Sequence, residues 1–123
     1  MRQKDLKVLQ ELAAMVRDRE MTKLARLTAA RQRLEAQHAA VGVQAGTARR
    51  AGMDDLLLSG AAERFTAWSL AKQAQLTQQI AALQEPIAFQ TAKTAKAVGR
   101  NENLGKIAET LKTEALKKAA NKL

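Results

Sequence analysis

Few residues in this 123-residue chain have the types and spacing that catalysis or metal binding requires. Cysteine is absent, so neither a disulfide nor a thiolate metal site can form. His38 is the only histidine and has no carboxylate cluster beside it, so we interpret it as a surface or seam residue. The stretch 99–106 resembles a phosphate-binding loop. However, it has one residue too many between its glycines, Ile107 where Ser or Thr is needed, and no strand before it. We therefore expect a non-enzymatic protein that holds no cofactor and no metal.

The composition is typical of long helices. Hydrophobic residues make up 46% of the chain, but many are alanine, and there is a single proline. The only aromatic residues are Phe65, Trp68 and Phe89. No apolar run approaches the roughly 20 residues that span a bilayer, and the charged first residues do not resemble a secretory signal. We expect an all-α, soluble, cytoplasmic protein with a single domain over residues 1–123.

The second half of the chain carries the pattern around which the rest is organised. Apolar residues recur there in alternating steps of four and three over more than four heptads, which is typical of a coiled coil. The positions are Leu76, Ile80, Leu83, Ile87, Gln90, Thr94, Ala97, Asn101, Leu104, Ala108, Leu111 and Ala115. Because the stripe is narrow, one neighbouring helix would cover most of it. This pattern predicts a second helix over about residues 61–120.

The first helix is expected over about residues 2–48. Its main seam row is apolar at six of seven positions. The row consists of Leu6, Ala13, Glu20, Leu27, Leu34, Val41 and Ala48. Gly42 and Gly46 each lower helix propensity by about 1 kcal/mol relative to alanine, so this helix is expected to fray from there. A tip loop is expected over about residues 51–60, with residues 56–58 folded back over the tip and Ser59 as the N-cap of the second helix.

The two helices are predicted to pair as a long antiparallel coiled-coil hairpin. In such a hairpin, residues whose numbers sum to about 110 lie opposite each other, which brings Leu104 near Leu6. Near the tip, Trp68 falls opposite Gly42 and Phe65 opposite residue 45. These aromatic residues have two interpretations, either packing at the tip or a partly exposed contact for a partner.

Three features interrupt the regular pattern. Pro86 lacks an N–H group and should kink the second helix without ending the stripe. Asn101 is either a register-setting polar residue in the seam or a tolerated polar position. Beyond about residue 108 the second helix has no partner in the first, and this basic amphipathic tail is expected to fray in the free protein.

Charge is distributed unevenly along the chain. Residues 1–33 and residues 90–123 each carry a net charge of +5, whereas residues 34–89 carry −1. A hairpin would bring the two basic segments together at the end that holds both termini. This polarity predicts an acidic partner at that end.

The helical pattern resembles that of the FliJ/YscO family of type III secretion systems. The resemblance rests on the basic first helix, a tip near residues 52–53, and three segments of the second helix: residues 62–65 (AERF), 78–83 (QQIAAL) and 103–107 (NLGKI). Members of this family are antiparallel two-helix rods that are similar to the central stalk of rotary ATPases. They associate with the hexameric export ATPase and contact the export gate and substrate chaperones.

The resemblance implies a role for each charged or aromatic group. The basic terminal end would enter the ATPase ring, and the candidates for ring contact are Arg17, Arg19, Arg31, Arg33, Lys93, Lys96 and Arg100. Tail residues that would contact a partner are Leu111, Leu116, Lys117 and Lys118. The near-neutral tip, with Phe65 and Trp68, would face the gate. The protein would be a monomer or weak oligomer, peripheral to the inner-membrane secretion apparatus.

Two alternatives come from other functional classes. A basic coiled coil can bind nucleic acid, with affinity that falls steeply as salt rises. Against this, basic residues are interleaved with acidic ones, and only Phe89 lies near the basic end as a stacking group. The other alternative is a structural scaffold whose functional unit is a homodimer.

Overall fold

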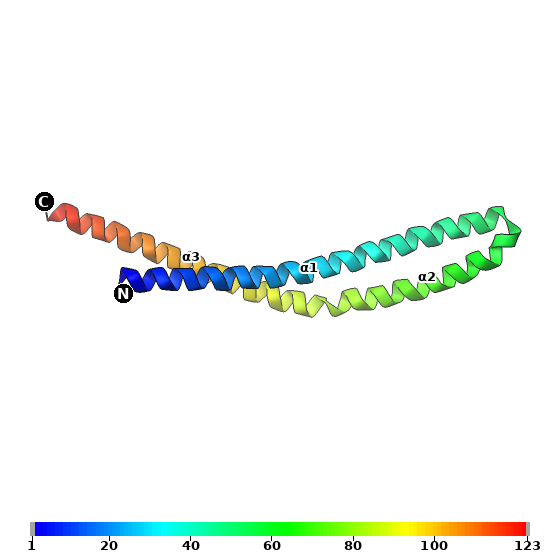
Figure 1. Ribbon diagram of the computed structural model, residues 1–123, viewed down its shortest axis with the longest axis horizontal. Coiled ribbons are helices and arrows are strands. Elements are labelled where there is room, and N and C mark those ends of the chain that lie inside the picture. Colours follow the sequence, from blue (N-terminus) through cyan, green and yellow to red (C-terminus); the bar gives the residue numbers. More distant parts are fainter. Residues whose placement is uncertain (1, 123) are drawn as a thin grey trace. The chain divides into compact units, whose positions relative to one another are not determined.

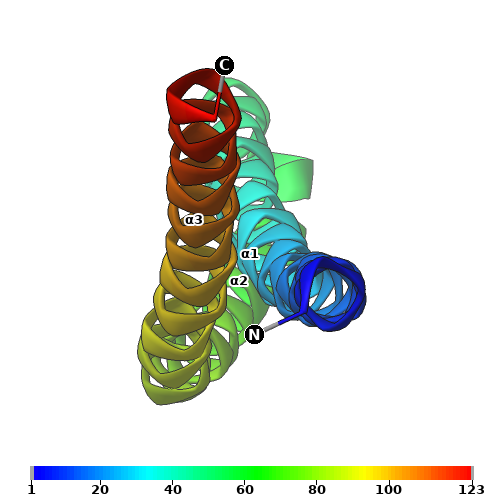
Figure 2. The same cartoon turned by 90° about the vertical axis from the view of Figure 1, so that its left-hand side faces the viewer.

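The computed structural model describes residues 2–122, and nearly all of them are helical. The chain forms α1 (Gln3–Asp54), α2 (Leu56–Ala82) and α3 (Gln84–Asn121). Two views at right angles show only helices and their short connections, with no strand among the described residues (Figures 1 and 2). The prediction of an all-α protein is confirmed.

These helices contribute to two compact units. Unit 1 combines residues 1–25 with residues 88–123, and unit 2 is the continuous stretch 26–87. The single domain over residues 1–123 stays a prediction, and the two units are described separately below. Each unit has its own buried residues, and only α1 and α3 run from one unit into the other.

In unit 2 the chain reverses around one residue, Asp55, which lies between α1 and α2 (Figure 1). The backbone of Asp55 is extended, with φ −141° and ψ 112°, and its carboxylate accepts a hydrogen bond of 2.9 Å from the N–H of Leu57. This is the usual way in which an N-cap carboxylate satisfies a free N–H group of the first helical turn. One aspartate is therefore enough to end one helix and begin the next.

The expected loop over residues 51–60 is wrong, because helix extends up to Asp55 from both sides. Ser59 is not the N-cap, since it lies inside α2 and its hydroxyl donates to the carbonyl of Leu56 at 2.9 Å. Leu56 and Leu57 do not fold over the tip either, and each is more than 90% exposed. The N-cap at Asp55 explains this difference, since it starts α2 before the leucines can turn back.

The helix α1 continues past Gly42 and Gly46 to Asp54, so the expected fraying is also wrong. The reason lies in the residues next to these glycines. Val41 and Ala45 are both buried, together with Ser69 and Leu76 of α2. Burial of this seam offsets the low helix propensity of glycine, because tertiary packing supplies most of the stability of helices in proteins.

The glycines of α1 differ in the space around them, which gives a test of the packing in unit 2. A Cβ atom at Gly52 would lie 2.6 Å from the Cβ of Ala62, whereas a Cβ at Gly46 would meet nothing within 4 Å. We expect Gly52→Ala to lower the free energy of unfolding by about 1–2 kcal/mol. The cost of crowding against Ala62 should exceed the stability that alanine gains from its higher helix propensity. The matched variant Gly46→Ala should raise it by about 0.5–1 kcal/mol. Urea unfolding of both variants measures the difference, and equal effects would contradict the close approach at Gly52.

The pairing of residues near the tip differs from the prediction. A Cβ at Gly42 would lie 2.9 Å from the side-chain nitrogen of Gln73, so Gln73, and not Trp68, lies opposite this glycine. Pairs in unit 2 therefore have numbers that sum to about 115 instead of 110.

The second long helix of the prediction is divided at Leu83. Leu83 is the C-cap of α2, its N–H bonds to the carbonyl of Ile80 at 3.1 Å, and α3 begins at the next residue. Pro86 thus lies in the first turn of α3, where a missing N–H leaves no helical hydrogen bond unmade. The predicted interruption is present, but it falls three residues before the proline.

In unit 1, the first part of α1 packs against α3. The buried residues of this unit are Leu6 and Glu20 from α1, and Gln90, Thr94 and Ala97 from α3. Three of these five carry polar side chains, which makes the seam of unit 1 unusual. The tail does not fray as predicted, because α3 remains helical to Asn121.

Candidate functional site: a polar cluster below a basic surface

Glu20 is the most deeply buried charged residue described, with only 1% of its surface exposed. It lies in the apolar seam row of α1, so the helical period that buries Leu6 also turns Glu20 toward α3. Gln90 and Thr94 are one helical turn apart on α3, and both are 7% exposed. We call Glu20, Gln90 and Thr94 the polar clasp.

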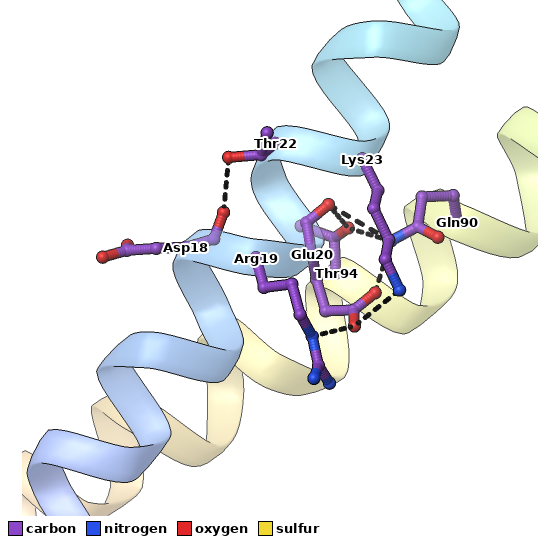
Figure 3. Close-up of polar contacts among 7 residues, drawn as sticks. All are labelled: Asp18, Arg19, Glu20, Thr22, Lys23, Gln90 and Thr94. Carbon is purple, nitrogen blue, oxygen red and sulfur yellow. Dashed lines mark hydrogen bonds and ion pairs between the residues drawn. The ribbon is translucent and has the colours of Figure 1, made fainter.

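The polar clasp joins α1 to α3 through side chains and backbone (Figure 3). The side-chain amide of Gln90 donates to the Glu20 carboxylate at 2.6 Å and approaches the Glu20 backbone carbonyl at 3.1 Å. The Thr94 hydroxyl donates to the same carbonyl at 3.1 Å, and the Gln90 amide lies 3.3 Å from that hydroxyl. Both α3 residues therefore recognise a single residue of α1.

Two cations of α1 flank the other carboxylate oxygen of Glu20 (Figure 3). Oε1 lies 3.4 Å from Nε of Arg19 and 3.7 Å from Nζ of Lys23, but it has no hydrogen-bond partner. Lys93 of α3 adds a further positive charge nearby, and its ammonium group also lies 6.0 Å from the centre of the Phe89 ring. The buried carboxylate is thus held by one amide and three cations.

These neighbours lower the pKa of Glu20. The hydrogen bond from Gln90 has the largest effect, and the charges of Lys23, Lys93 and Arg19 act in the same direction. Burial alone would raise the pKa, because it disfavours the charged form, but this effect is smaller than the others combined. Glu20 is therefore a stable carboxylate at neutral pH and is poorly suited to act as a general acid.

The contacts of the polar clasp serve recognition between α1 and α3. Among residues 2–122, no group of three or more His, Asp or Glu side chains could hold a metal ion. His38 is half-buried in unit 2 and borders a small hollow with Glu35, Thr77 and Ile80. It lies outside the polar clasp, which is in unit 1.

Unit 1 also carries most of the positive charge of the protein. Its two segments hold fourteen basic and seven acidic residues, a net charge of +7, compared with +2 for unit 2. Five of the seven residues predicted to contact an ATPase ring lie in unit 1, and the other two, Arg31 and Arg33, lie in unit 2. The five are Arg17, Arg19, Lys93, Lys96 and Arg100.

The predicted ring-contact residues differ in their surroundings. Arg17 lies 3.0 Å from the carboxylate of Asp18, and Arg31 lies 3.8 Å from that of Glu35. Arg33, Lys96 and Arg100 are exposed. Because Arg19 and Lys93 act on Glu20, they are part of the internal structure of unit 1 as well as its surface. Lys96 and Arg100 are therefore the better probes of an external contact.

The predicted tail contacts lie on the last turns of α3. Leu111 is half-buried, Leu116 is 64% exposed, and Lys117 and Lys118 are exposed. A shallow polar hollow lies on this segment, bordered by Lys106, Glu109, Thr110, Thr113, Glu114 and Lys117. The tail thus presents both apolar and basic side chains to the surroundings.

The predicted gate contacts lie on α2 in unit 2. Phe65 is half-buried, Trp68 is 52% exposed, and their ring centres are 5.6 Å apart. A mainly apolar hollow of about 490 Å³ lies elsewhere on this unit. It is bordered by Arg49, Gly52, Met53, Ser59, Ala62, Glu63, Thr66, Ala67 and Leu70. The aromatic pair does not border this hollow. The hollow itself was not predicted from the sequence.

No helix within residues 2–122 is long and apolar enough to cross a membrane. Comparison of the chain with protein-family models, curated proteins and solved structures gave no match.

Sequence reasoning assigned all three residues of the polar clasp to the seam but missed their contact. The signal was available, because Glu20 is the one polar member of its seam row and lies opposite Gln90 when paired numbers sum to 110. Thr94 follows one helical turn later in the partner stripe. Polar exceptions that fall opposite each other in two seams predict a hydrogen-bonded contact.

Proposed function

We propose that this chain is a non-enzymatic central stalk component of a type III secretion export apparatus. Its basic unit 1 would insert into the hexameric export ATPase, and unit 2 would contact the export gate or substrate chaperones. The protein would act in the cytoplasm, beside the inner-membrane apparatus. The single observation that carries this proposal is the concentration of positive charge on unit 1, with a net charge of +7.

A stalk of this kind requires a long antiparallel coiled-coil hairpin, which we propose for the whole chain. Contacts within the units support this arrangement. In unit 1, Glu20 contacts Gln90, and in unit 2, Gly42 faces Gln73 and Gly52 faces Ala62. The partner numbers fall as the α1 numbers rise, which is the order expected for antiparallel helices.

The distribution of charge supports an acidic partner for unit 1. Exposed cations accelerate association with an acidic surface and give it a dependence on ionic strength. Lys96 and Arg100 are four residues apart on α3, so they lie on the same helical face, and both are exposed. We propose this pair as part of the ring contact.

We expect the double variant Lys96→Glu/Arg100→Glu to weaken association with the cognate export ATPase by about tenfold or more, and to abolish stimulation of its activity. The reason is that like charges would then face each other across the interface. Titration of the ATPase with the stalk protein, followed by light scattering and phosphate release, measures both effects. Wild-type association should also weaken as salt is raised.

The matched control is Arg49→Glu/Arg50→Glu, which changes the net charge by the same amount on exposed residues of unit 2. It should associate with the ATPase as the wild-type protein does. If both variants lose ATPase association equally, net charge alone matters. If neither variant loses it, the charge-guided model is refuted. Binding to duplex DNA that is lost in both variants, without any ATPase binding, would favour the nucleic-acid alternative.

A further inference from the structure

We propose that the polar clasp is a specificity lock, which holds the two segments of unit 1 in one register and disfavours pairing of α1 with α1 of a second copy of the chain. The inference does not depend on the proposed function, since it concerns the isolated protein. It rests on a buried glutamate whose carboxylate accepts a hydrogen bond from Gln90 of α3, and whose backbone carbonyl accepts one from Thr94 of α3.

The rest of the unit 1 seam does little to fix a register. Among the described residues of this unit, Leu6 and Ala97 are the only buried apolar side chains. Alanine fills little volume, so a seam of small residues tolerates sliding and exchange of partners. In coiled coils, a single buried polar residue often determines register and the number of chains, at some cost in stability.

Sliding by one heptad would separate Glu20 from its hydrogen-bond donors. A shift of one heptad would replace Gln90 by Leu83 or Ala97, which are seven residues before and after it. Neither has a polar side-chain group. Glu20 would then be a buried carboxylate without the Gln90 amide, which donates to it at 2.6 Å in the observed register. Arg19 and Lys23 would stay beside Glu20, since they belong to α1, but the buried oxygen that accepts from Gln90 would lose its donor. An unpaired buried acceptor is destabilising, so the shifted registers are disfavoured.

Pairing of α1 with α1 of a second copy is rejected for a related reason. In a parallel pair, Glu20 would face Glu20 at the same seam position, and two carboxylates would be buried together. Arg19 and Lys23 would accompany each carboxylate, since they belong to α1. The Gln90 amide and the charge of Lys93 would be missing, because both belong to α3.

A charge swap tests the lock directly. Gln90→Glu places two carboxylates opposite each other. The double variant Glu20→Gln/Gln90→Glu exchanges donor and acceptor and restores the side-chain bond, although residue 90 no longer donates to the backbone carbonyl of residue 20. Because the chain has no cysteine, spin labels can be attached to cysteines introduced at the exposed positions Met15 and Glu102 of unit 1. A shift of one heptad would change their separation by about 10 Å. Sedimentation of the same samples reports the number of chains.

We expect a single narrow distance and a monomer for the wild-type protein. Gln90→Glu should lose the single distance or form dimers, and the swap should restore both properties. Asn103→Asp, which adds a carboxylate at an exposed position of α3, should behave as the wild-type protein does. A narrow distance and a monomer for Gln90→Glu, or failure of the swap to restore them, would overturn the proposal.

An apolar variant covers the case in which Gln90→Glu does not fold. Glu20→Leu/Gln90→Leu/Thr94→Leu removes all polar groups of the clasp together and leaves none unsatisfied, so its helices should persist. The lock predicts that this variant populates more than one register or forms dimers. One narrow distance in a monomer would show that the clasp does not select the register.

Discussion

Replacing Leu76 with alanine is expected to lower the free energy of unfolding by about 2–5 kcal/mol. Leu76 is the largest fully buried side chain of the protein among residues 2–122, with 1% of its surface exposed. Removing its three outer carbon atoms would lose the free energy gained by their burial away from water, and would leave a cavity in the seam of unit 2. Because unit 2 buries few other large side chains, neighbouring atoms cannot easily fill that space.

Urea unfolding followed by circular dichroism at 222 nm measures this effect. Leu70→Ala is the matched control, because Leu70 lies on the same helix and is 64% exposed. It should change stability by about 0.5 kcal/mol or less. Similar losses in the two variants would mean that Leu76 is not the central packing residue of unit 2.

The burial of Leu76 could be predicted from the sequence, because an apolar stripe of period 3.5 shows which side of a helix faces its partner. The same reasoning assigned Leu6, Val41 and Ala97 to the seam, and all three are buried. Periodicity depends on side-chain spacing alone, so it survives errors in the position of the helix ends. This is why the all-α class and the seam residues were predictable.

The tip could not be predicted in the same way, because it depends on one local hydrogen bond. Asp55 caps α2 through the N–H of Leu57, which removes the expected loop. The pairing within unit 2 also differs from the prediction, because Gly42 faces Gln73, and Trp68 is 52% exposed.

The polar clasp was hidden for a different reason. A coiled-coil seam is recognised by its apolar residues, so Glu20, Gln90 and Thr94 appear as exceptions in two mostly apolar rows. Their complementarity depends on atoms that meet across the seam, at 2.6 Å for the Gln90 amide and the Glu20 carboxylate. Once the pairing of the helices is known, these exceptions become the most specific contact of unit 1.

Replacing Gln90 with leucine should therefore destabilise the protein at neutral pH. The change removes the donor that has the largest lowering effect on the pKa of Glu20, while the burial that opposes ionisation remains. We expect the melting temperature at pH 7 to fall by on the order of 5 °C or more, because a buried acceptor would be left without its partner.

The sign of the pH dependence follows from the pKa of Glu20. In the wild-type protein this pKa is lowered on folding, so the carboxylate stabilises the fold above the unfolded value of about 4.3. That stabilisation is lost as the pH falls through the folded pKa. In folded Gln90→Leu, the pKa of Glu20 is higher than in the folded wild-type protein. The ionised carboxylate therefore stabilises the variant less, and the variant loses less stability in acid. The gap between the melting temperatures of the two proteins should therefore narrow below about pH 4.

Thermal unfolding between pH 3 and 7, followed by circular dichroism, measures this gap. Glu20→Gln serves as the control, because it fills nearly the same volume and has no carboxylate to titrate. Its melting temperature should lack the part of the pH dependence that Glu20 contributes in the wild-type protein. A gap between wild type and Gln90→Leu that stays constant across this range would mean that Gln90 acts through packing alone. A gap that narrows in acid would identify the Gln90 amide as the group that keeps a charged glutamate inside the seam of unit 1.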